Sequence, residues 1–361
     1  MPFLIIRDDI TNVCVDAIVN AANCHLKQGG GVCGDIFRVA GADRLQAACD
    51  RLAPIKTGEA VITDGFDSKA DYIIHTAGPV YEKGNPHQEQ QLYSCYHNSL
   101  SLAAEKHLAS IAFPLISAGI YGYPPEQALS IAVRAIHDFL GSYEGNMTVY
   151  MVFYDKAFAA AKKMYDQVED YIDAHLVDRD ELMQQRNRYE RSLSRERRAW
   201  NAEEEEDDEI VRKTIKPISS VSFHIQLPPK KSVDADSVDD FFEKLEDSFN
   251  KRLFKFIRAK NMSNVDVYKN ANIDRRLFSK IISNEKYTPN KNTILALSIS
   301  LRLNLDETKA LLGSAGYALS HSSKADLVVE YYITHHFPSD FNIYDLNFLL
   351  FTHDLEQLGQ V

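Results

Sequence analysis

The sequence has few of the features that mark secreted or membrane proteins. Its five cysteines all lie in the first third of the chain and form no CxxC pair. A disulfide framework and a zinc site of ordinary ligand spacing are therefore not expected, and free thiols in a reducing cytoplasm are the simplest interpretation. No apolar run approaches the roughly 18 residues that a membrane span requires. The first residues show no basic segment followed by an apolar one, so we expect no secretory signal and no membrane partner.

Two common nucleotide-binding motifs are missing as well. The chain contains no GxxxxGK[ST] motif, so hydrolysis of a nucleoside triphosphate is not expected. No GxGxxG follows the first apolar strand, which argues against a dinucleotide-dependent redox enzyme. We therefore predict no cofactor and no bound metal.

What the chain does contain is the composition of an ordinary globular protein, with length for two domains. It has 361 residues, of which 45% are hydrophobic and 25% charged, and each domain has material for its own core. The formal net charge is −11. This charge is spread unevenly, because acids are concentrated in the middle of the chain and a basic stretch lies near its end.

Residues 1–173 alternate between short apolar runs and segments with helical spacing. Strands are predicted at 2–6, 13–19, 58–63, 71–79, 110–116 and 148–154. Helices are predicted at 35–52, 88–107, 125–140 and 156–173. Strands that alternate with helices predict an α/β layered fold around a largely parallel sheet, whose ligands bind at the carboxyl ends of the strands.

Two glycine-rich loops follow predicted strands in this domain. The first, at 29–34, comes after an apolar strand that ends in Asn20 and Asn23, and it leads into a predicted helix. The second occupies 117–122. Glycine lets backbone N–H groups approach a phosphate, a helix N-terminus favours negative charge, and asparagine amides both donate and accept hydrogen bonds. We therefore predict that both loops face one site for phosphate and ribose.

Six short motifs in this domain together resemble the macrodomain family, in its hydrolase-like class. They are Asp9-Ile10, DAIVNAAN at 16–23, GGGV at 29–32, IHTAGP at 74–79, Phe113-Pro114 and SAGIYGYP at 117–124. The resemblance covers about residues 1–172 and implies a three-layer α/β fold with a mostly parallel central sheet. Members of this family bind ADP-ribose, and many remove it from proteins or nucleic acids or deacetylate O-acetyl-ADP-ribose.

The resemblance also implies roles for individual residues. Asp9 would accept the adenine amino group and Ile10 would line the adenine pocket. Tyr154 would stack there, unless it packs in the core. Asn23 would hold the distal ribose beside the reacting carbon, which makes it the catalytic candidate, and Asn20 would support the end of the strand.

Glycine-rich segments would contact the rest of the ligand. The distal ribose and a phosphate would be wrapped by Gly29, Gly30, Gly31 and Val32. The diphosphate would be cradled by Ser117, Ala118, Gly119, Ile120, Tyr121 and Gly122. Backbone N–H groups of two such loops neutralise a diphosphate without an obligatory Lys or Arg, and Tyr121 supplies an aromatic wall for a ribose unless it packs in the core. His75 lies inside a predicted strand and is interpreted as a core or supporting histidine.

The chain departs from the family's pattern directly after the GGGV run. The hydrolases usually carry an aspartate there, which positions or activates water, whereas this chain has Cys33. An unperturbed thiol is mostly protonated at neutral pH and is a poor substitute for a carboxylate base. Asp35 lies roughly 200° around a helix from that position and cannot replace it. Phe37 also stands where the family usually has a histidine.

Three interpretations of this departure stay open. The domain binds ADP-ribose without hydrolysing it, or it hydrolyses with water held by the ligand phosphate and Asn23, or Cys33 is itself a nucleophile or redox-active group. For Cys33 alone, packing as a small residue at a helix start is favoured over special chemistry.

Residues 174–237 are predicted to form a charged linker. Its first part is helix-prone, and residues 203–209 are seven consecutive acids. Such a block repels itself and usually stays disordered. A solvated spacer is the favoured interpretation, and screening of a basic partner surface is the alternative.

Residues 238–361 are predicted to form an all-α domain. Within it, 251–313 resembles the phage-repressor-like helix-turn-helix class, whose second helix would carry Arg275, Arg276, Ser279 and Lys280 as nucleic-acid contacts. The chain departs from that class at Tyr268, where a small residue is usual, and at Asn272, where the turn usually has Gly. Residues 251–320 hold 13 Lys and Arg against 5 Asp and Glu, which suits DNA, although a protein-interaction module with a basic surface is the equal alternative. The apolar tail at 326–358 completes this core or forms a dimer face.

Two functions follow from these patterns. In the first, the chain reads or removes ADP-ribose on modified macromolecules and is targeted by its C-terminal domain. In the second, it is a DNA-binding regulator that senses a free ADP-ribose metabolite. Both place it in the cytoplasm.

Overall fold

The structure is a computed structural model that describes residues 3–154, 166–176, 247–336 and 341–359. Nearly all of the predicted linker 174–237 and the start of the predicted C-terminal domain lie outside these residues, so the predictions made for them stay predictions. In the part of the chain that is described, no helix is both long and apolar enough to span a membrane.

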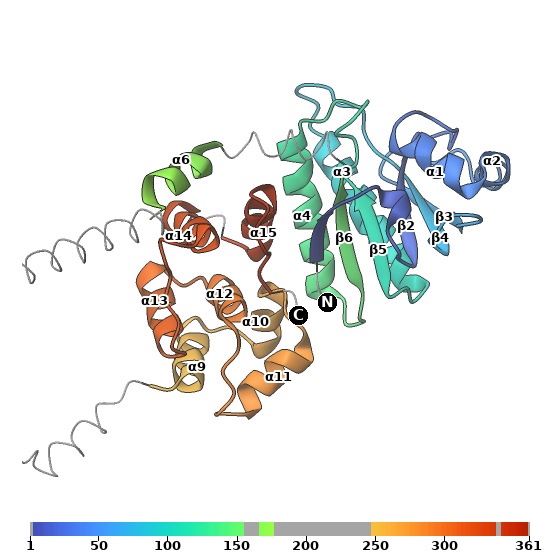
Figure 1. The fold of residues 1–361 in the computed structure, drawn as a ribbon. Helices are drawn as coiled ribbons and strands as arrows, with labels where there is room; N and C mark the ends of the chain where they lie inside the picture. The colour runs from blue at the N-terminus through green and yellow to red at the C-terminus, as the bar shows by residue number, and fades with distance from the viewer. Residues whose placement is uncertain (1–2, 155–165, 177–246, 337–340, 360–361) are drawn as a thin grey trace, which may run out of the picture. The chain divides into compact units, whose positions relative to one another are not determined.

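A six-stranded sheet forms the centre of the N-terminal region (Figure 1). Its strands are β1 (Phe3–Arg7), β2 (Ala17–Ala22), β3 (Ala60–Asp64), β4 (Tyr72–Ala77), β5 (Ser110–Pro114) and β6 (Thr148–Phe153). They lie in the order β1-β6-β5-β2-β4-β3, and every neighbouring pair is parallel except β3 with β4. The predicted α/β fold with a mostly parallel sheet is therefore confirmed, with one antiparallel strand at an edge.

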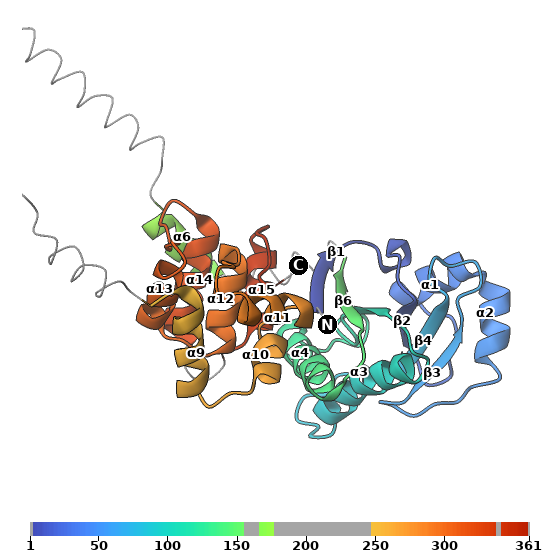
Figure 2. The same cartoon turned by 90° about the horizontal axis from the view of Figure 1, so that it is seen from below.

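Helices cover both faces of this sheet. They are α1 (Val32–Ala40), α2 (Ala42–Cys49), α3 (Gln88–Glu105) and α4 (Pro125–Ser142), with a 3₁₀ turn at Ile10–Asn12. Helices α3 and α4 pack together on one face (Figure 2). On the other face, α1 buries Ile36 and Phe37 against Ile18 of β2 and Ile73 of β4. These are the layers that a parallel sheet requires, because both of its faces are apolar.

The single helix predicted at 35–52 is wrong. Two helices stand there, because Gly41 adopts φ 87° between them. Gly41 follows Ala40, the last residue of α1. Its carbonyl accepts a hydrogen bond from Leu45 N, and this bond closes the first turn of α2. Apolar spacing on both sides of Gly41 made the segment read as one continuous pattern.

The C-terminal region is helical, as predicted. Its helices are α9 (Phe249–Ala259), α10 (Asn264–Asn270), α11 (Arg275–Ser283), α12 (Lys291–Ser300), α13 (Leu305–Gly313), α14 (Lys324–His336) and α15 (Ile343–Thr352), and α6 (Asp166–His175) packs on α14. Side-chain oxygens of Ser263, Asp274, Asn290, Asn304 and Asn342 cap five of these helices at their N-termini. From Thr293 to Ser300, α12 is buried on every side and forms the centre of this core.

The apolar tail is buried, in agreement with a role in the core. Leu327 and Val328 of α14 and Leu346 and Leu350 of α15 have no exposed surface. Helix α15 also packs on β1, where Tyr344 lies edge-to-face against Phe3 with ring centroids 5.3 Å apart.

Two side-chain amides of the helical region bind the backbone of strand β1. Asn272 Oδ1 accepts from Phe3 N at 2.8 Å, and its Nδ2 donates to Phe3 O at 3.0 Å. Gln357 repeats the pattern two residues on, with Ile5 N donating to Oε1 at 3.3 Å and Nε2 donating to Ile5 O at 2.7 Å. Since β1 is an edge strand, these amides occupy positions that the next strand of a sheet would fill.

Candidate ligand-binding site

Asn20 lies within β2 and is fully buried. Its Nδ2 is 3.1 Å from His75 Nδ1 on the neighbouring strand β4 and donates to Cys33 Sγ at 3.7 Å. Its Oδ1 is buried and has no hydrogen-bond partner among the described residues. Such a group costs free energy unless it is satisfied. A buried acceptor thus lies on the residue that contacts Cys33 near the start of α1. The supporting role of Asn20 stays a prediction.

His75 is a buried histidine, as predicted. Its Nε2 lies 3.0 Å from Thr63 Oγ1 on β3, and Cys49 Sγ lies 3.8 Å from the same nitrogen. Burial lowers the pKa of His75 to about 4, so the ring is neutral at pH 7. Burial also raises the pKa of the Cys49 thiol to about 11. The cluster is therefore uncharged and lets β2, β3 and β4 meet without a buried ion.

Asn23 closes the loop that follows β2. Its Nδ2 donates to Lys27 O at 2.7 Å, and its Oδ1 accepts from His25 N and Lys27 N. The side chain is half-buried. Asn23 thus lies at the end of β2, as predicted, but both ends of its amide already bind the backbone. A ribose at this position would share or replace these hydrogen bonds.

The glycine run leads into α1 through a tight turn. Gly31 caps the helix with φ 61°, a conformation that side chains rarely adopt. A Cβ on Gly34 would lie only 2.7 Å from Gly29 O, so the turn folds closely over the first helical residues. The exposed backbone of Gly29, Gly30 and Gly31 precedes a helix N-terminus, where N–H groups are free to bind an anion.

Cys33 points inward from the start of α1. It is 6% exposed and belongs to the apolar core between the sheet and α1. Its contacts are Asn20 Nδ2 and, at 4.0 Å, Lys27 O. Asp35 is exposed and forms an ion pair with Arg38 at 3.0 Å, and Phe37 is buried. The structure therefore agrees with packing as the role of Cys33 and leaves no carboxylate in its place.

The second glycine-rich loop connects β5 to α4. Ser117 has φ 64° and Gly122 has φ 69°, and Gly122 N donates to Gly119 O at 2.9 Å. A Cβ on Gly119 would meet no atom within 4 Å. The loop ends at Pro125, the first residue of α4. A curled backbone beside a helix N-terminus is a seat for negative charge.

The two loops meet, as the sequence predicts. The nearest heavy atom to a Cβ on Gly30 is Ile120 Cδ1, at 3.5 Å, although Ile120 is 80% exposed. Ser117 Oγ is buried without a hydrogen-bond partner among the described residues. Burial raises the pKa of Tyr121, and its half-buried ring is not a core residue. Ala118 is half-buried between Ser117 and Gly119.

The residues predicted to hold the adenine differ in their exposure and contacts. Asp9 Oδ1 accepts from Thr11 N at 2.9 Å and from Thr11 Oγ1 at 2.7 Å, which caps the 3₁₀ turn. Ile10 is 4% exposed and lies in the core. Tyr154 is 59% exposed, so of its two interpretations core packing is wrong. Val32 is half-buried and packs against the core cluster that includes Ile10.

Comparison with known proteins shows which family the chain belongs to. The Macro domain family model matches residues 19–132. A macro domain-containing protein of Chlorobaculum tepidum is 49% identical over 152 residues, which are 42% of this chain and 88% of that protein. The chain belongs to the macro domain family. An O-acetyl-ADP-ribose deacetylase of Salmonella typhimurium is 47% identical over 159 residues, or 43% of this chain and 88% of that enzyme.

Solved macrodomain structures are also similar to the N-terminal region of the chain. The Oceanobacillus iheyensis macrodomain with MES bound is 36% identical and covers 46% of this chain and 91% of its own, with a TM-score of 0.42. The Trypanosoma brucei macrodomain in complex with ADP-ribose is 38% identical and covers 44% and 66%, with a TM-score of 0.40.

Sequence reasoning missed several residues that build this macrodomain site. Gly78 directly follows β4 and lies so close to Ser117 that a Cβ on it would collide with Ser117 Oγ. From the sequence, the Gly-Pro pair predicted only the end of a strand. Lys27 supplies the backbone groups that bind Asn23, and no local pattern marks it. Thr63 and Cys49 complete the polar cluster around His75 and are distant from it in sequence.

The nucleic-acid candidates lie together on α11. Arg275, Arg276, Ser279 and Lys280 are all exposed, and Lys280 Nζ lies 4.0 Å from the centroid of the Tyr287 ring. Asn272 has φ 54° in the turn before this helix, as its tolerance of that conformation predicts. Tyr268 packs on Phe278 with ring centroids 5.8 Å apart, so the larger residue is accommodated between α10 and α11.

Proposed function

We propose that the N-terminal domain binds ADP-ribose, free or attached to a macromolecule. The observation that carries the proposal is the meeting of the two loops at Gly30 and Ile120, each beside a helix N-terminus. Backbone N–H groups from two sides suit a diphosphate. The unpartnered Asn20 Oδ1 and Ser117 Oγ supply polar groups from β2 and from the loop that follows β5.

The relatives support this ligand. The Salmonella typhimurium enzyme that is 47% identical to this chain over 159 residues is an O-acetyl-ADP-ribose deacetylase, and its ligand contains ADP-ribose. The roles of Asp9, Asn23 and Tyr154 in holding adenine and ribose belong to the same proposal. The exposed ring of Tyr154 is free to stack on a base.

Binding is favoured over hydrolysis. The position that would activate water is Cys33, a buried thiol whose surroundings are apolar except for the Asn20 amide and Lys27 O. The exposed Asp35 is already paired with Arg38. The domain is therefore proposed as a reader of ADP-ribose, and removal of the modification is the alternative activity.

Calorimetric titration with ADP-ribose tests the binding. Gly119→Glu introduces a carboxylate where a side chain meets no atom, so it should leave the fold intact and abolish binding by repelling the phosphates. Gly313→Glu is the matched control, since Gly313 in α13 also has open space around it. Wild-type protein that releases no heat with ADP-ribose, or equal affinity in both variants, would overturn the proposal.

Hydrolysis is tested separately with Cys33→Asp. Release of ADP-ribose from a mono-ADP-ribosylated protein is measured for the wild type and the variant. The reader proposal expects an inert wild type, and a gain of activity in Cys33→Asp would show that the carboxylate is what the site lacks. Turnover by the wild type would instead establish the chain as a hydrolase.

We propose in addition that the helical region directs the domain to duplex DNA. The specific observation is that all four polar candidates on α11 are exposed on one short helix that follows a turn at Asn272. Replacement of Arg275 and Arg276 by Ala should weaken binding to random duplex DNA, while Arg258→Ala on α9 should not. Binding that does not fall with added salt would contradict the proposal, because phosphate contacts release counterions.

A further inference from the structure

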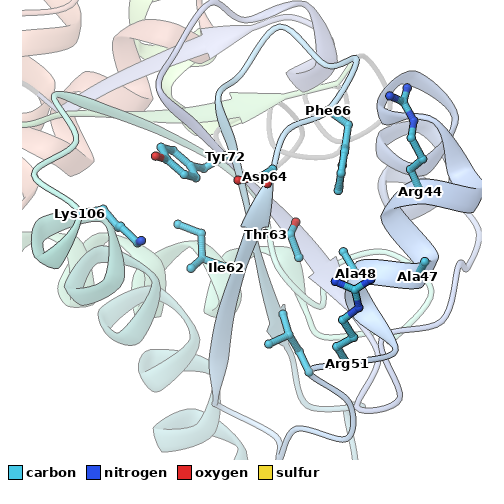
Figure 3. Close-up of a pocket in the computed structure, with 11 residues that line it drawn as sticks. Arg44, Ala47, Ala48, Arg51, Ile62, Thr63, Asp64, Phe66, Tyr72 and Lys106 are labelled. Carbon is cyan, nitrogen blue, oxygen red and sulfur yellow. The ribbon is translucent and has the colours of Figure 1, made fainter.

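A cavity of about 510 Å³ lies along β3, the edge strand at the far side of the sheet from β1 (Figure 3). We call it the β3 cavity. Its lining comes from α2 and the turn after it, from β3, and from the ends of β4 and α3, namely Arg44, Ala47, Ala48, Arg51, Leu52, Ile62, Thr63, Asp64, Phe66, Tyr72 and Lys106. Apart from Thr63, whose hydroxyl contacts His75, none of these residues belongs to the ligand-binding site described above.

The outer edge of β3 presents backbone groups to this cavity. Gly65 N donates to Asp71 O and Ala77 N donates to Glu59 O, so the odd-numbered residues of β3 bind β4. In an antiparallel pair, the alternate residues point their N–H and C=O groups away from the partner strand. These are Ala60, Ile62 and Asp64. Among the described residues, nothing forms a hydrogen bond to these outward groups.

Apolar surface is exposed beside this edge. Leu52 and Phe66 are each 38% exposed and lie at the cavity. The side chains of Ile62 and Tyr72 line its other side (Figure 3). An extended chain placed next to β3 would therefore cover apolar groups on both of its faces.

Cations lie on both sides of the edge. Figure 3 shows Lys106 with Tyr72 on one side of β3 and Arg51 on the other. Neither Lys106 nor Arg51 has an ion-pair partner within the described residues, whereas Arg44 is paired with Asp67. Asp64 is the one acidic residue in the lining. Successive side chains of an added strand point to opposite faces, so acidic residues on either face would meet a cation.

We propose that the β3 cavity binds an extended acidic peptide, which adds as a strand to β3. Backbone donors and acceptors of Ile62 and Asp64 pair with the peptide backbone, and Arg51 and Lys106 select acidic side chains between apolar ones. A peptide suits the site better than a nucleic acid. The outward N–H and C=O groups of β3 alternate as a strand requires, while the cations stand on opposite sides of β3 and Asp64 lies beside the groups that a phosphate backbone would approach.

The test uses the full chain and a fluorescein-labelled, end-capped peptide of about six residues, in which Val flanks a central Glu-Glu pair whose two side chains point to opposite faces. Fluorescence anisotropy should show saturable binding that weakens with salt, and the Lys/Val analogue should not bind. Arg51→Glu and Lys106→Glu should each weaken binding about tenfold, a change of ordinary size for the loss of a charge contact. Lys83→Glu, an exposed residue outside the cavity, is the matched control.

A backbone variant distinguishes strand addition from attraction by charge alone. Ile62→Pro removes an outward N–H that no described residue uses, and proline is tolerated at such positions of edge strands. It should abolish peptide binding while affinity for ADP-ribose stays unchanged, which also shows that the variant folds. Equal binding by Ile62→Pro, equal binding of the Lys/Val peptide, or tighter binding of a single-stranded oligonucleotide would each overturn the proposal. If Ile62→Pro also loses ADP-ribose binding, the variant has not kept its fold. The peptide proposal is then judged from the Arg51→Glu and Lys106→Glu variants.

Discussion

The outward backbone groups at the two edges of the sheet differ in their hydrogen-bond partners. At β1, the amides of Asn272 and Gln357 bind both the N–H and the C=O of Phe3 and Ile5. At β3, the equivalent groups of Ile62 and Asp64 meet no donor or acceptor among the described residues. The strand β1 is buried under the helical region at Phe3 and Ile5, whereas β3 borders a cavity.

The comparison shows how side chains can satisfy the outward N–H and C=O groups of an edge strand when no further strand pairs with it. Alternate residues of an edge strand present their backbone groups on the same side, so one amide side chain can serve each of them. Closure of this kind is needed where the edge is buried, because an unpaired N–H or C=O costs free energy there. At β3 water or a peptide can meet the same groups. An open edge is a template for pairing with another chain.

The largest expected effect comes from breaking the closure at β1. Asn272→Ala would leave the N–H and C=O of Phe3 buried without partners and would place Ala in a left-handed conformation. Together these cost about 4 kcal/mol of unfolding free energy, measured by chemical denaturation. Asn272→Gly is the control that keeps the conformation and loses only the amide, and it should cost less. A loss below about 1 kcal/mol in Asn272→Ala would mean that the amide does not close the edge.

Near β3, the stability of the sheet depends on a buried histidine that is neutral in the folded protein. Because the pKa of His75 is lowered to about 4, the unfolded chain binds more protons than the folded one between that value and the ordinary pKa near 6.5. Stability from this site is fully present above about pH 6.5 and is lost as the pH falls toward 4, by up to about 3 kcal/mol. Denaturation at several pH values measures it. His75→Gln should flatten the profile in this window, and an equal slope in both proteins would contradict the prediction.

Gln357→Ala should have a smaller effect than Asn272→Ala. It removes the second amide from β1. Gln357 is itself partly exposed, so water can enter in place of its side chain and reach the otherwise buried backbone of Ile5. We expect a loss of about 1 kcal/mol. Glu356→Ala, one residue earlier and exposed, serves as the control for changes in this tail. A loss equal to that of Asn272→Ala would show that both amides are equally sealed from water.

The smallest effect is expected at the open edge. Arg51→Glu changes an exposed side chain without an ion-pair partner in the described part of the chain, so the free energy of unfolding should change by less than about 0.5 kcal/mol. A thermal melt beside the wild type measures this. A larger loss would mean that Arg51 stabilises the fold, and its use as a test of peptide binding would then need Lys106→Glu in its place.

Local patterns predicted most of the secondary structure but not every break or direction. Gly41 interrupts a pattern that is apolar on both sides, and only its φ of 87° separates α1 from α2. The antiparallel direction of β3 had a signal that was not used. Only residues 65–71 connect β3 to β4, whereas a parallel connection needs a dozen or more.

The residues of the candidate site also fall into two groups, those with a local sequence signal and those without one. The glycines at 29–31 and 117–122 were predicted because a turn that approaches a phosphate demands them locally. Ser117 at φ 64° and the collision that excludes a side chain from Gly78 have no local signature. They arise where the ends of β4 and β5 converge, which no pattern along a single strand records.

The chemistry of neighbouring residues is enough to predict the layered α/β fold, the helical C-terminal region, the glycine-rich loops and the left-handed turn at Asn272. The role of the Asn272 side chain depends instead on contacts between distant segments. Its amide reaches Phe3, 269 positions away in the chain, and closes β1, while β3 keeps an open edge. Backbone hydrogen bonds between distant segments depend on which surfaces meet, and that is set by the packing of the whole molecule.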